Sequence, residues 1–125
     1  LSDWFMLYVV QNFALDGLLY PLVYDRIVDD HLAMRNGSAV AMLTAFMTEW
    51  YGESAKWVDA QIKIAAAESP ANRELLSEWT RTWRDRALSA LVPVAAMALG
   101  EQAQAAADEV LGQFNSRAAK LGLSV

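Results

Sequence analysis

Carboxylates and a single histidine are the residues of this chain that could perform metal or acid–base chemistry. His31 is the sole histidine, and the sequence contains no cysteine, which excludes a zinc site with His and Cys ligands and also thiolate chemistry. No nucleophile-elbow pattern accompanies the histidine, and the six glycines lie too far apart to form a phosphate-binding loop. The inventory leaves a carboxylate-bridged metal pair as the site to test in detail.

A di-iron carboxylate site needs about four inward carboxylates and two Glu-x-x-His pairs, because positions i and i+3 of a helix share one face. The residue three places before His31 is Val28, and no histidine follows Glu49 or Glu53 at that spacing. A homodimer would bring a second copy of His31 but not the missing spacing. We therefore expect no catalytic, cofactor-binding or metal-binding residue on this chain.

Asp16 is the carboxylate in the most apolar surroundings, among Leu15, Leu18 and Leu19. Burial there would raise its pKa and produce a functional carboxylate. The alternative, which we favour, is a structural aspartate paired with an Arg or Lys of a neighbouring helix, because buried ionisable groups are usually paired. Asn12 lies one turn earlier on the same face.

His31 and the tryptophans have simpler interpretations. His31 follows two aspartates near a helix end, which favours a solvated or capping role over catalysis. The tryptophans recur at helical spacing and fit core or interface anchors better than a ligand-binding box. They are Trp4, Trp50, Trp57, Trp79 and Trp83.

Four helices would carry these residues, since apolar positions recur every three or four residues and no strand-like alternation is sustained. We expect helices at about residues 2 to 28–32, 39–67, 70–99 and 101–121. Short connections would make successive helices antiparallel neighbours. The predicted fold is a single all-α domain over residues 1–125, a bundle of long helices.

Local signals set the boundaries of the first two helices. Ser2 and Asp3 can cap the first helix, and Pro21 should kink it because proline removes a backbone donor. The run at residues 35–38, Arg-Asn-Gly-Ser, is the first break, with Ser38 as the candidate N-cap of the second helix.

The third and fourth helices also have clear ends. Ser69 as N-cap and Pro70 at the first helical position begin the third helix. Pro93 should bend or interrupt it near its end, and Gly100 closes it. Gly122 stops the fourth helix.

The second helix is strongly amphipathic in sequence. Its apolar positions form one stripe: Leu43, Phe46, Met47, Trp50, Trp57, Ile64 and Ala65. Its charged positions form the opposite face: Glu49, Glu53, Lys56, Asp59 and Lys63. Asp59 and Lys63 stand in the favourable i,i+4 order for an ion pair.

The segment at residues 4–24 is apolar around almost its whole circumference, so we expect it to be surrounded by other protein. Hydrophobic residues make up 55% of only 125 residues, and small domains have much surface for their volume. A partner subunit is the simplest cover, although a high alanine content is an alternative explanation. Asp16 near the centre of the segment makes a membrane span costly.

The net charge of −5 and the scattered basic residues argue against nucleic acid as a partner. No signal peptide is visible, and we expect a cytoplasmic protein. The chain begins without Met and already inside an apolar pattern, so we expect it to be a fragment.

Several motifs resemble one known family along nearly the whole chain. They are YVVQNFALDGLLYPLVY (residues 8–24), Gly-Ser-Ala at 37–39, AMLTAFMTEWYGESAKWVDA (41–60) and AAAESPANRELLSEW (65–79). Together they resemble the C-terminal half of the β subunit of bacterial multicomponent di-iron monooxygenases, of the phenol hydroxylase and toluene monooxygenase type.

The resemblance implies a ferritin-like fold without iron ligands, as the C-terminal part of a longer subunit. It implies an α2β2γ2 hydroxylase whose α subunit holds the di-iron centre, with an effector protein and an NADH-dependent reductase as further partners. The complex would hydroxylate phenol, toluene or a similar hydrocarbon with O2. The rival interpretation is a free-standing helical module that binds an apolar ligand or dimerises.

Overall fold

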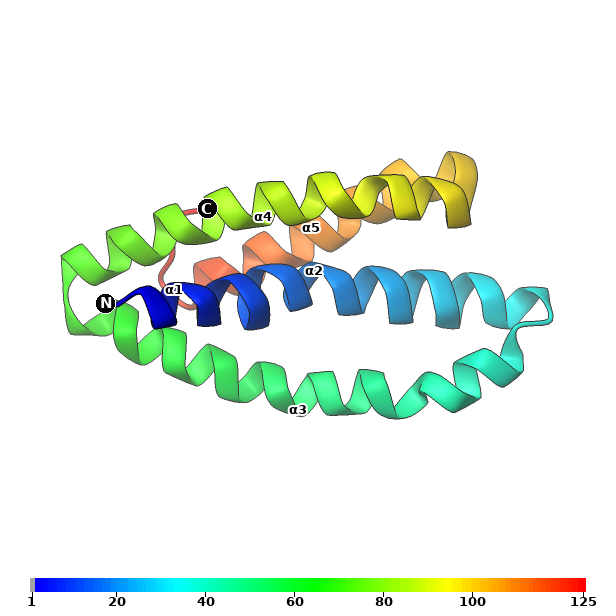
Figure 1. Cartoon of the computed structure of the whole chain (residues 1–125), viewed down its shortest axis with the longest axis horizontal. Coiled ribbons are helices and arrows are strands. Elements are labelled where there is room, and N and C mark those ends of the chain that lie inside the picture. Colours follow the sequence, from blue (N-terminus) through cyan, green and yellow to red (C-terminus); the bar gives the residue numbers. More distant parts are fainter. Residues whose placement is uncertain (1) are drawn as a thin grey trace.

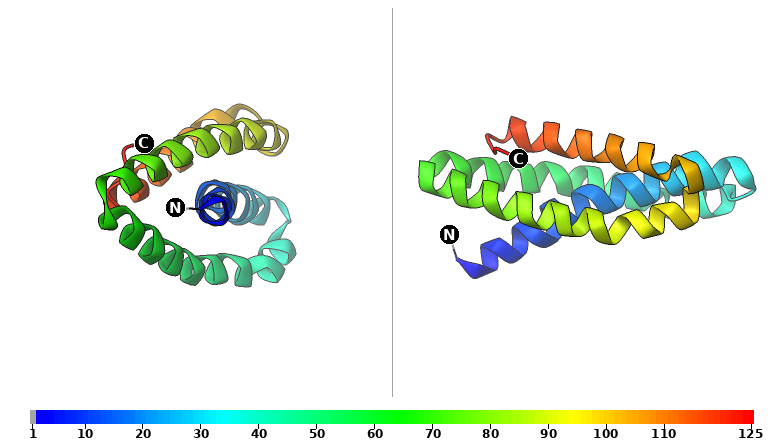
Figure 2. Two further views of the ribbon diagram at one scale, coloured as in Figure 1. Left: turned by 60° about the vertical axis from the view of Figure 1, so that its left-hand side comes forward. Right: turned by 90° about the horizontal axis from the view of Figure 1, so that it is seen from above.

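Long antiparallel helices make up residues 2–125, the part of the chain that this computed structural model describes (Figure 1). An N-terminal helix (Asp3–Arg35) is followed by α3 (Ser38–Glu68), α4 (Pro70–Leu99) and α5 (Ala103–Lys120). Figure 2 shows the N-terminal helix between α3 on one side and the α4–α5 pair on the other. The described residues contain no strand, so the all-α prediction is confirmed.

Of the four predicted helices, α3, α4 and α5 are continuous α-helices, whereas the N-terminal helix is of mixed type. It is composed of α1 (Asp3–Tyr8), η1 (Val9–Leu15), α2 (Asp16–Tyr20), η2 (Pro21–Leu32) and η3 (Ala33–Arg35). The η1 and η2 segments have π-helical turns and η3 is a 3-10 turn. π turns are rare and usually single, and here they bring residues five apart onto one face.

The ends of the N-terminal helix differ from the prediction. Ser2 occupies the N-cap position, but its side chain makes no capping bond. The helix runs through Pro21 with helical dihedral angles (φ −60°, ψ −42°), and the π turns of η2 begin at this residue. The helix ends three residues later than the latest predicted end, where Asn36 adopts a left-handed conformation (φ 66°).

Gly37, not Ser38, is the N-cap of α3. Its amide donates a 2.7 Å hydrogen bond to the Leu32 carbonyl oxygen. A Cβ atom at position 37 would lie 2.5 Å from that oxygen, so the tight turn requires glycine.

The predicted start and end of α4 are confirmed. The Ser69 hydroxyl accepts a 3.1 Å hydrogen bond from the Asn72 amide, and Pro70 is the first helical residue. Gly100 ends the helix with φ 57°. Pro93 does not interrupt α4, which is continuous to Leu99.

The C-terminal end of α5 closes as predicted at Gly122. This residue has φ 87°, and its amide donates to the Ala119 carbonyl while the Leu123 amide donates to the Ala118 carbonyl. These two bonds form a Schellman motif.

The core is centred on the N-terminal helix. Phe13, Leu18 and Leu22 are fully buried there, and Phe13 packs on Phe114 of α5 with ring centroids 5.0 Å apart. The expectation that residues 4–24 are surrounded by protein therefore holds for the middle of the segment. The chain itself does not cover the start of the segment, because Trp4 is 67% exposed.

The inward face of α3 is not the apolar stripe identified in the sequence. The buried residues of α3 are Val58, Ile62, Ala65 and Ala66, and of the predicted stripe only Ala65 is among them. Trp50 and Trp57 are 55% and 60% exposed, and Leu43 is 73% exposed. The helix has two apolar sides, and its own chain covers the one composed of smaller residues.

The N-terminal helix is long and apolar enough to cross a membrane by length and composition alone. A core helix passes the same test, and this helix packs against α3, α4 and α5.

Candidate functional site

One cluster of polar side chains surrounds Arg117 in the middle of the bundle, and another surrounds His31 near the Asn36 turn. Neither cluster was predicted as a unit, because each joins residues from different helices.

Arg117 of α5 ties three helices together. Its Nε and one terminal nitrogen contact Asp59 Oδ1 of α3 at 2.8 and 2.7 Å. Its other terminal nitrogen donates to the Tyr51 hydroxyl at 2.9 Å, and its guanidinium lies 4.8 Å from the centroid of the Phe13 ring. Asp59 therefore pairs with Arg117 and not with Lys63, and we call this cluster the Arg117 node.

Close packing of the backbone supports the Arg117 node. Gly17 lies opposite α5, and a Cβ atom there would come within 2.9 Å of the Phe114 ring and 3.2 Å of an Arg117 nitrogen. Any larger residue at position 17 would clash with Phe114 and Arg117. Glycine is therefore required for steric reasons and not for its backbone dihedral angles.

Asp16 has no cation partner among residues 2–125, contrary to the interpretation that we favoured. Its Oδ1 accepts one long hydrogen bond, 3.4 Å, from Gln11 Nε2. Burial raises the pKa of Asp16, and the Gln11 bond only partly opposes that rise. The carboxylate is thus partly desolvated without the charge that would compensate it.

An aromatic seam fills the contact between the N-terminal helix and α3. Tyr20 stacks on Tyr51 with centroids 4.8 Å apart and lies 6.0 Å from Trp50. Farther along, Tyr8 meets Trp57 edge-on at 5.7 Å. Burial raises the pKa of Tyr8, of Tyr20 and of Tyr51, so these phenols are neutral at physiological pH.

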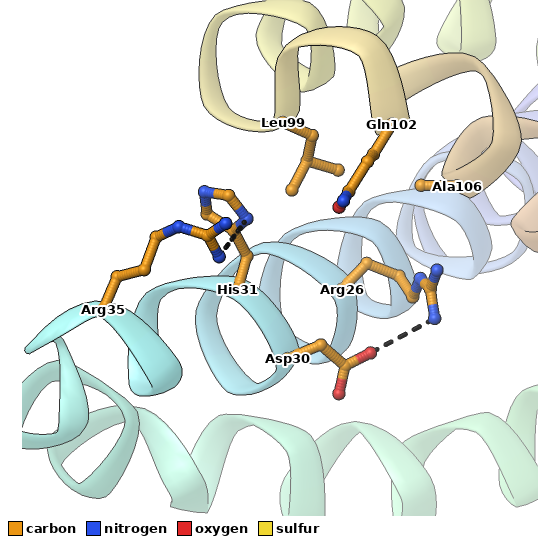
Figure 3. Close-up of a pocket in the computed structure, with 7 residues that line it drawn as sticks. All are labelled: Arg26, Asp30, His31, Arg35, Leu99, Gln102 and Ala106. Atoms are coloured by element: carbon orange, nitrogen blue, oxygen red, sulfur yellow. Dashed lines mark hydrogen bonds and ion pairs between the residues drawn. The ribbon is translucent and has the colours of Figure 1, made fainter.

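His31 lines a small hollow of about 80 Å³ together with Arg26, Asp30 and Arg35 (Figure 3). Arg35 lies 3.2 Å from His31 Nδ1. An arginine can only donate, so this contact is a hydrogen bond only in the His31 tautomer in which Nδ1 accepts. Arg26 pairs with Asp30 at 3.2 Å and with Glu109 at 3.3 Å. Of the two arginines that line the hollow, Arg26 pairs with carboxylates and Arg35 contacts the His31 ring.

A di-iron centre does not fit these residues. The described part of the chain contains no group of three or more His, Cys, Asp or Glu side chains that could hold a metal ion. The carboxylate of the Arg117 node is neutralised by the arginine, and Asp16 stands beside amide and phenol groups rather than further carboxylates. We derive no metal chemistry from this chain.

Comparison with known proteins gives consistent matches. A profile of the Methane/Phenol/Alkene Hydroxylase family matches residues 1–69. The chain is 50% identical over 98% of its length to the phenol 2-monooxygenase oxygenase component DmpL of Pseudomonas sp. strain CF600. It is 40% identical over 98% of its length to the oxygenase component MhpL of Acinetobacter pittii strain PHEA-2.

The structural comparison agrees. The whole chain matches part of the crystal structure of xenon-pressurised phenol hydroxylase from Pseudomonas sp. OX1, with a TM-score of 0.90 and 39% identity. The chain spans about a third of its relatives: 36% of each of the two oxygenase components and 37% of the crystallised chain. These matches confirm the resemblance found in the motifs, and the chain belongs to the Methane/Phenol/Alkene Hydroxylase family.

Proposed function

We propose that this chain is part of the non-catalytic β subunit of a phenol hydroxylase, a soluble cytoplasmic di-iron monooxygenase. The observation that carries the proposal is the 50% identity, along nearly the whole chain, to an oxygenase component of phenol 2-monooxygenase. The described residues contain no group of His, Asp and Glu side chains that could hold an iron pair, which supports the assignment to the subunit without the metal.

In this proposal the chain is the C-terminal part of a longer ferritin-like subunit and supplies rigid scaffold. The Arg117 node and the phenylalanine contact lock the N-terminal helix, α3 and α5 together. An α subunit would hold the di-iron centre, which uses O2 and electrons from an NADH-dependent reductase to hydroxylate phenol or a related hydrocarbon. A γ subunit and an effector protein complete the proposed assembly.

Metal content and reconstitution test the proposal together. We expect the purified chain to bind no stoichiometric iron, and its full-length subunit to co-purify with the iron-bearing subunit encoded beside it. Phenol hydroxylation by the complex, measured with NADH and the reductase, should disappear when this subunit is omitted. Stoichiometric iron or phenol turnover on the isolated chain would refute the non-catalytic role.

A further inference from the structure

The outward side of α3 carries an apolar repeat that nothing in the described structure covers. Leu43, Trp50, Trp57 and Ile64 follow one another at intervals of seven residues, and each is more than half exposed. Phe46 and Ala60 lie three residues after Leu43 and Trp57, at the second apolar position of such a heptad repeat. A seven-residue apolar repeat is typical of a helix that packs along its length against another helix.

This surface continues from α3 onto the N-terminal helix. Ring contacts run from Trp57 to Tyr8, from Tyr8 to Phe5 and from Phe5 to the exposed Trp4, at centroid distances of 5.7, 5.5 and 5.3 Å. The two helices lie side by side in Figures 1 and 2. We call the outward side of these two helices the open face; it is two helices wide, like one half of a four-helix bundle.

The centre of the open face carries more acidic than basic side chains: Asp16, Glu49 and Glu53 against Lys56. Asp16 lies in the N-terminal helix next to the aromatic seam and has no cation partner among residues 2–125. On α3, Glu49 and Glu53 flank Trp50, and only Glu53 is paired, with Lys56. A second copy of the chain would bring another set of these acids to the same seam, so the acidic centre disfavours a homodimer and favours a basic helix.

The exposed apolar area of the open face is close to the area that each partner buries in a stable interface. Its tryptophans and Phe46 are between 55% and 67% exposed, and each aromatic side chain offers about 150–250 Å² in total. The four rings alone therefore leave several hundred Å² of apolar surface, close to the roughly 300–600 Å² of the largest patch on a typical monomer. With the aliphatic members added, the surface approaches the ~800 Å² per partner of a stable interface.

We propose that the open face is covered by amphipathic helices from the remaining part of the same longer polypeptide, one of which places an Arg or Lys against Asp16. This proposal rests on the proposed function, in which the chain is one part of a longer subunit. The relatives support that source, because this chain spans only 36% of their length. A helix tethered in the same polypeptide also meets the face at a high effective concentration.

Thiol labelling tests whether the open face is covered. The sequence has no cysteine, so Ala60→Cys reports on the open face and Ala90→Cys, also exposed but on α4, is the matched control. Each variant is made in the 125-residue chain and in a full-length chimera that carries this segment in DmpL of Pseudomonas sp. strain CF600. Maleimide labelling is followed by peptide mass spectrometry.

In the chimera, without other subunits, we expect labelling at position 60 to slow by about tenfold or more, because a packed face must open before it reacts. Labelling at position 90 should not change. Equal labelling of position 60 in both proteins would overturn the proposal. So would protection that appears only after another subunit is added, or protection in the short chain with dimer formation.

Asp16→Asn tests whether a cation lies against Asp16, because the substitution should change Tm in opposite directions with and without that cation. In the short chain the substitution should raise Tm, since it removes a partly desolvated charge, whereas in the chimera it should lower Tm, since it removes the partner of the cation. Asp29→Asn, at an exposed site of the same helix, is the control. The same sign in both proteins would exclude the cation.

If the chimera does not fold, unmodified DmpL provides the same two tests at the positions that align with Ala60 and Asp16. Iron content and phenol turnover of the assembled hydroxylase test the proposed function separately. A refuted open-face contact would leave those two readouts unchanged.

Discussion

Replacement of Arg117 is the perturbation whose effect the structure defines best. Arg117→Ala removes the double contact to Asp59, the bond to Tyr51 and the stacking on Phe13. It also leaves the Asp59 carboxylate, whose side chain is 30% exposed, without a counter-charge between α3 and α5.

The magnitude follows from the burial of the pair. A hydrogen bond to a charged group contributes about 1.5–3 kcal/mol, and breaking a fully buried ion pair costs about 3–5 kcal/mol. The Arg117 and Asp59 side chains are 19% and 30% exposed, so water would still partly solvate the Asp59 carboxylate after the arginine is removed. We expect Arg117→Ala to lower the free energy of unfolding by about 2–4 kcal/mol, which is less than the loss for a fully buried ion pair.

Urea denaturation followed by far-ultraviolet circular dichroism measures this loss. The matched control is Lys56→Ala, because Lys56 pairs with Glu53 at 2.7 Å but both side chains are about three-quarters exposed. That exposed pair should contribute less than about 1 kcal/mol. Arg117→Lys should fall between wild type and Arg117→Ala, since lysine keeps the charge but not the planar fork. Equal losses for Arg117→Ala and Lys56→Ala would refute the view that the Arg117 node locks the bundle.

Three further predictions concern single positions in the short chain. Burial raises the pKa of folded Asp16 above the ordinary 3.8, so the folded state holds its proton to higher pH than the unfolded chain, and stability falls as pH rises from 3.8 through the folded pKa. Asp16→Asn should remove that part of the pH dependence in urea titrations at pH 3 to 7, and an unchanged pH profile would contradict the assigned burial. Gly17→Ala should destabilise by about 1–3 kcal/mol in thermal melts, because its Cβ would press on the Phe114 ring; a neutral result would mean that the ring yields freely. Ser69→Ala should cost about 1 kcal/mol through loss of the N-cap bond, whereas Ser38→Ala, which removes no cap, should be nearly neutral by the same denaturation assay.

Local chemistry in the sequence was enough to predict most helix ends. Ser69 followed by Pro70, and the glycines at 100 and 122, act within one turn of the chain, and each ends or begins a helix where expected. The absence of strand patterns likewise determined the all-α class. The π turns of the N-terminal helix (η1 and η2) were missed, because no residue type specifies an i+5 hydrogen bond.

The sequence could not determine which side of α3 faces its own chain. Periodicity marks a helix side as apolar, but α3 has two such sides, and only the tertiary structure places Val58 and Ile62 inward and Trp50 and Trp57 outward. The Arg117–Asp59 pair could not be predicted either, because its members lie 58 residues apart and Asp59 already had a local candidate partner in Lys63. Patterns report what a residue prefers, whereas the packing of distant helices decides which preference is satisfied, and the carboxylate of Asp16 is one that residues 2–125 leave without a cation.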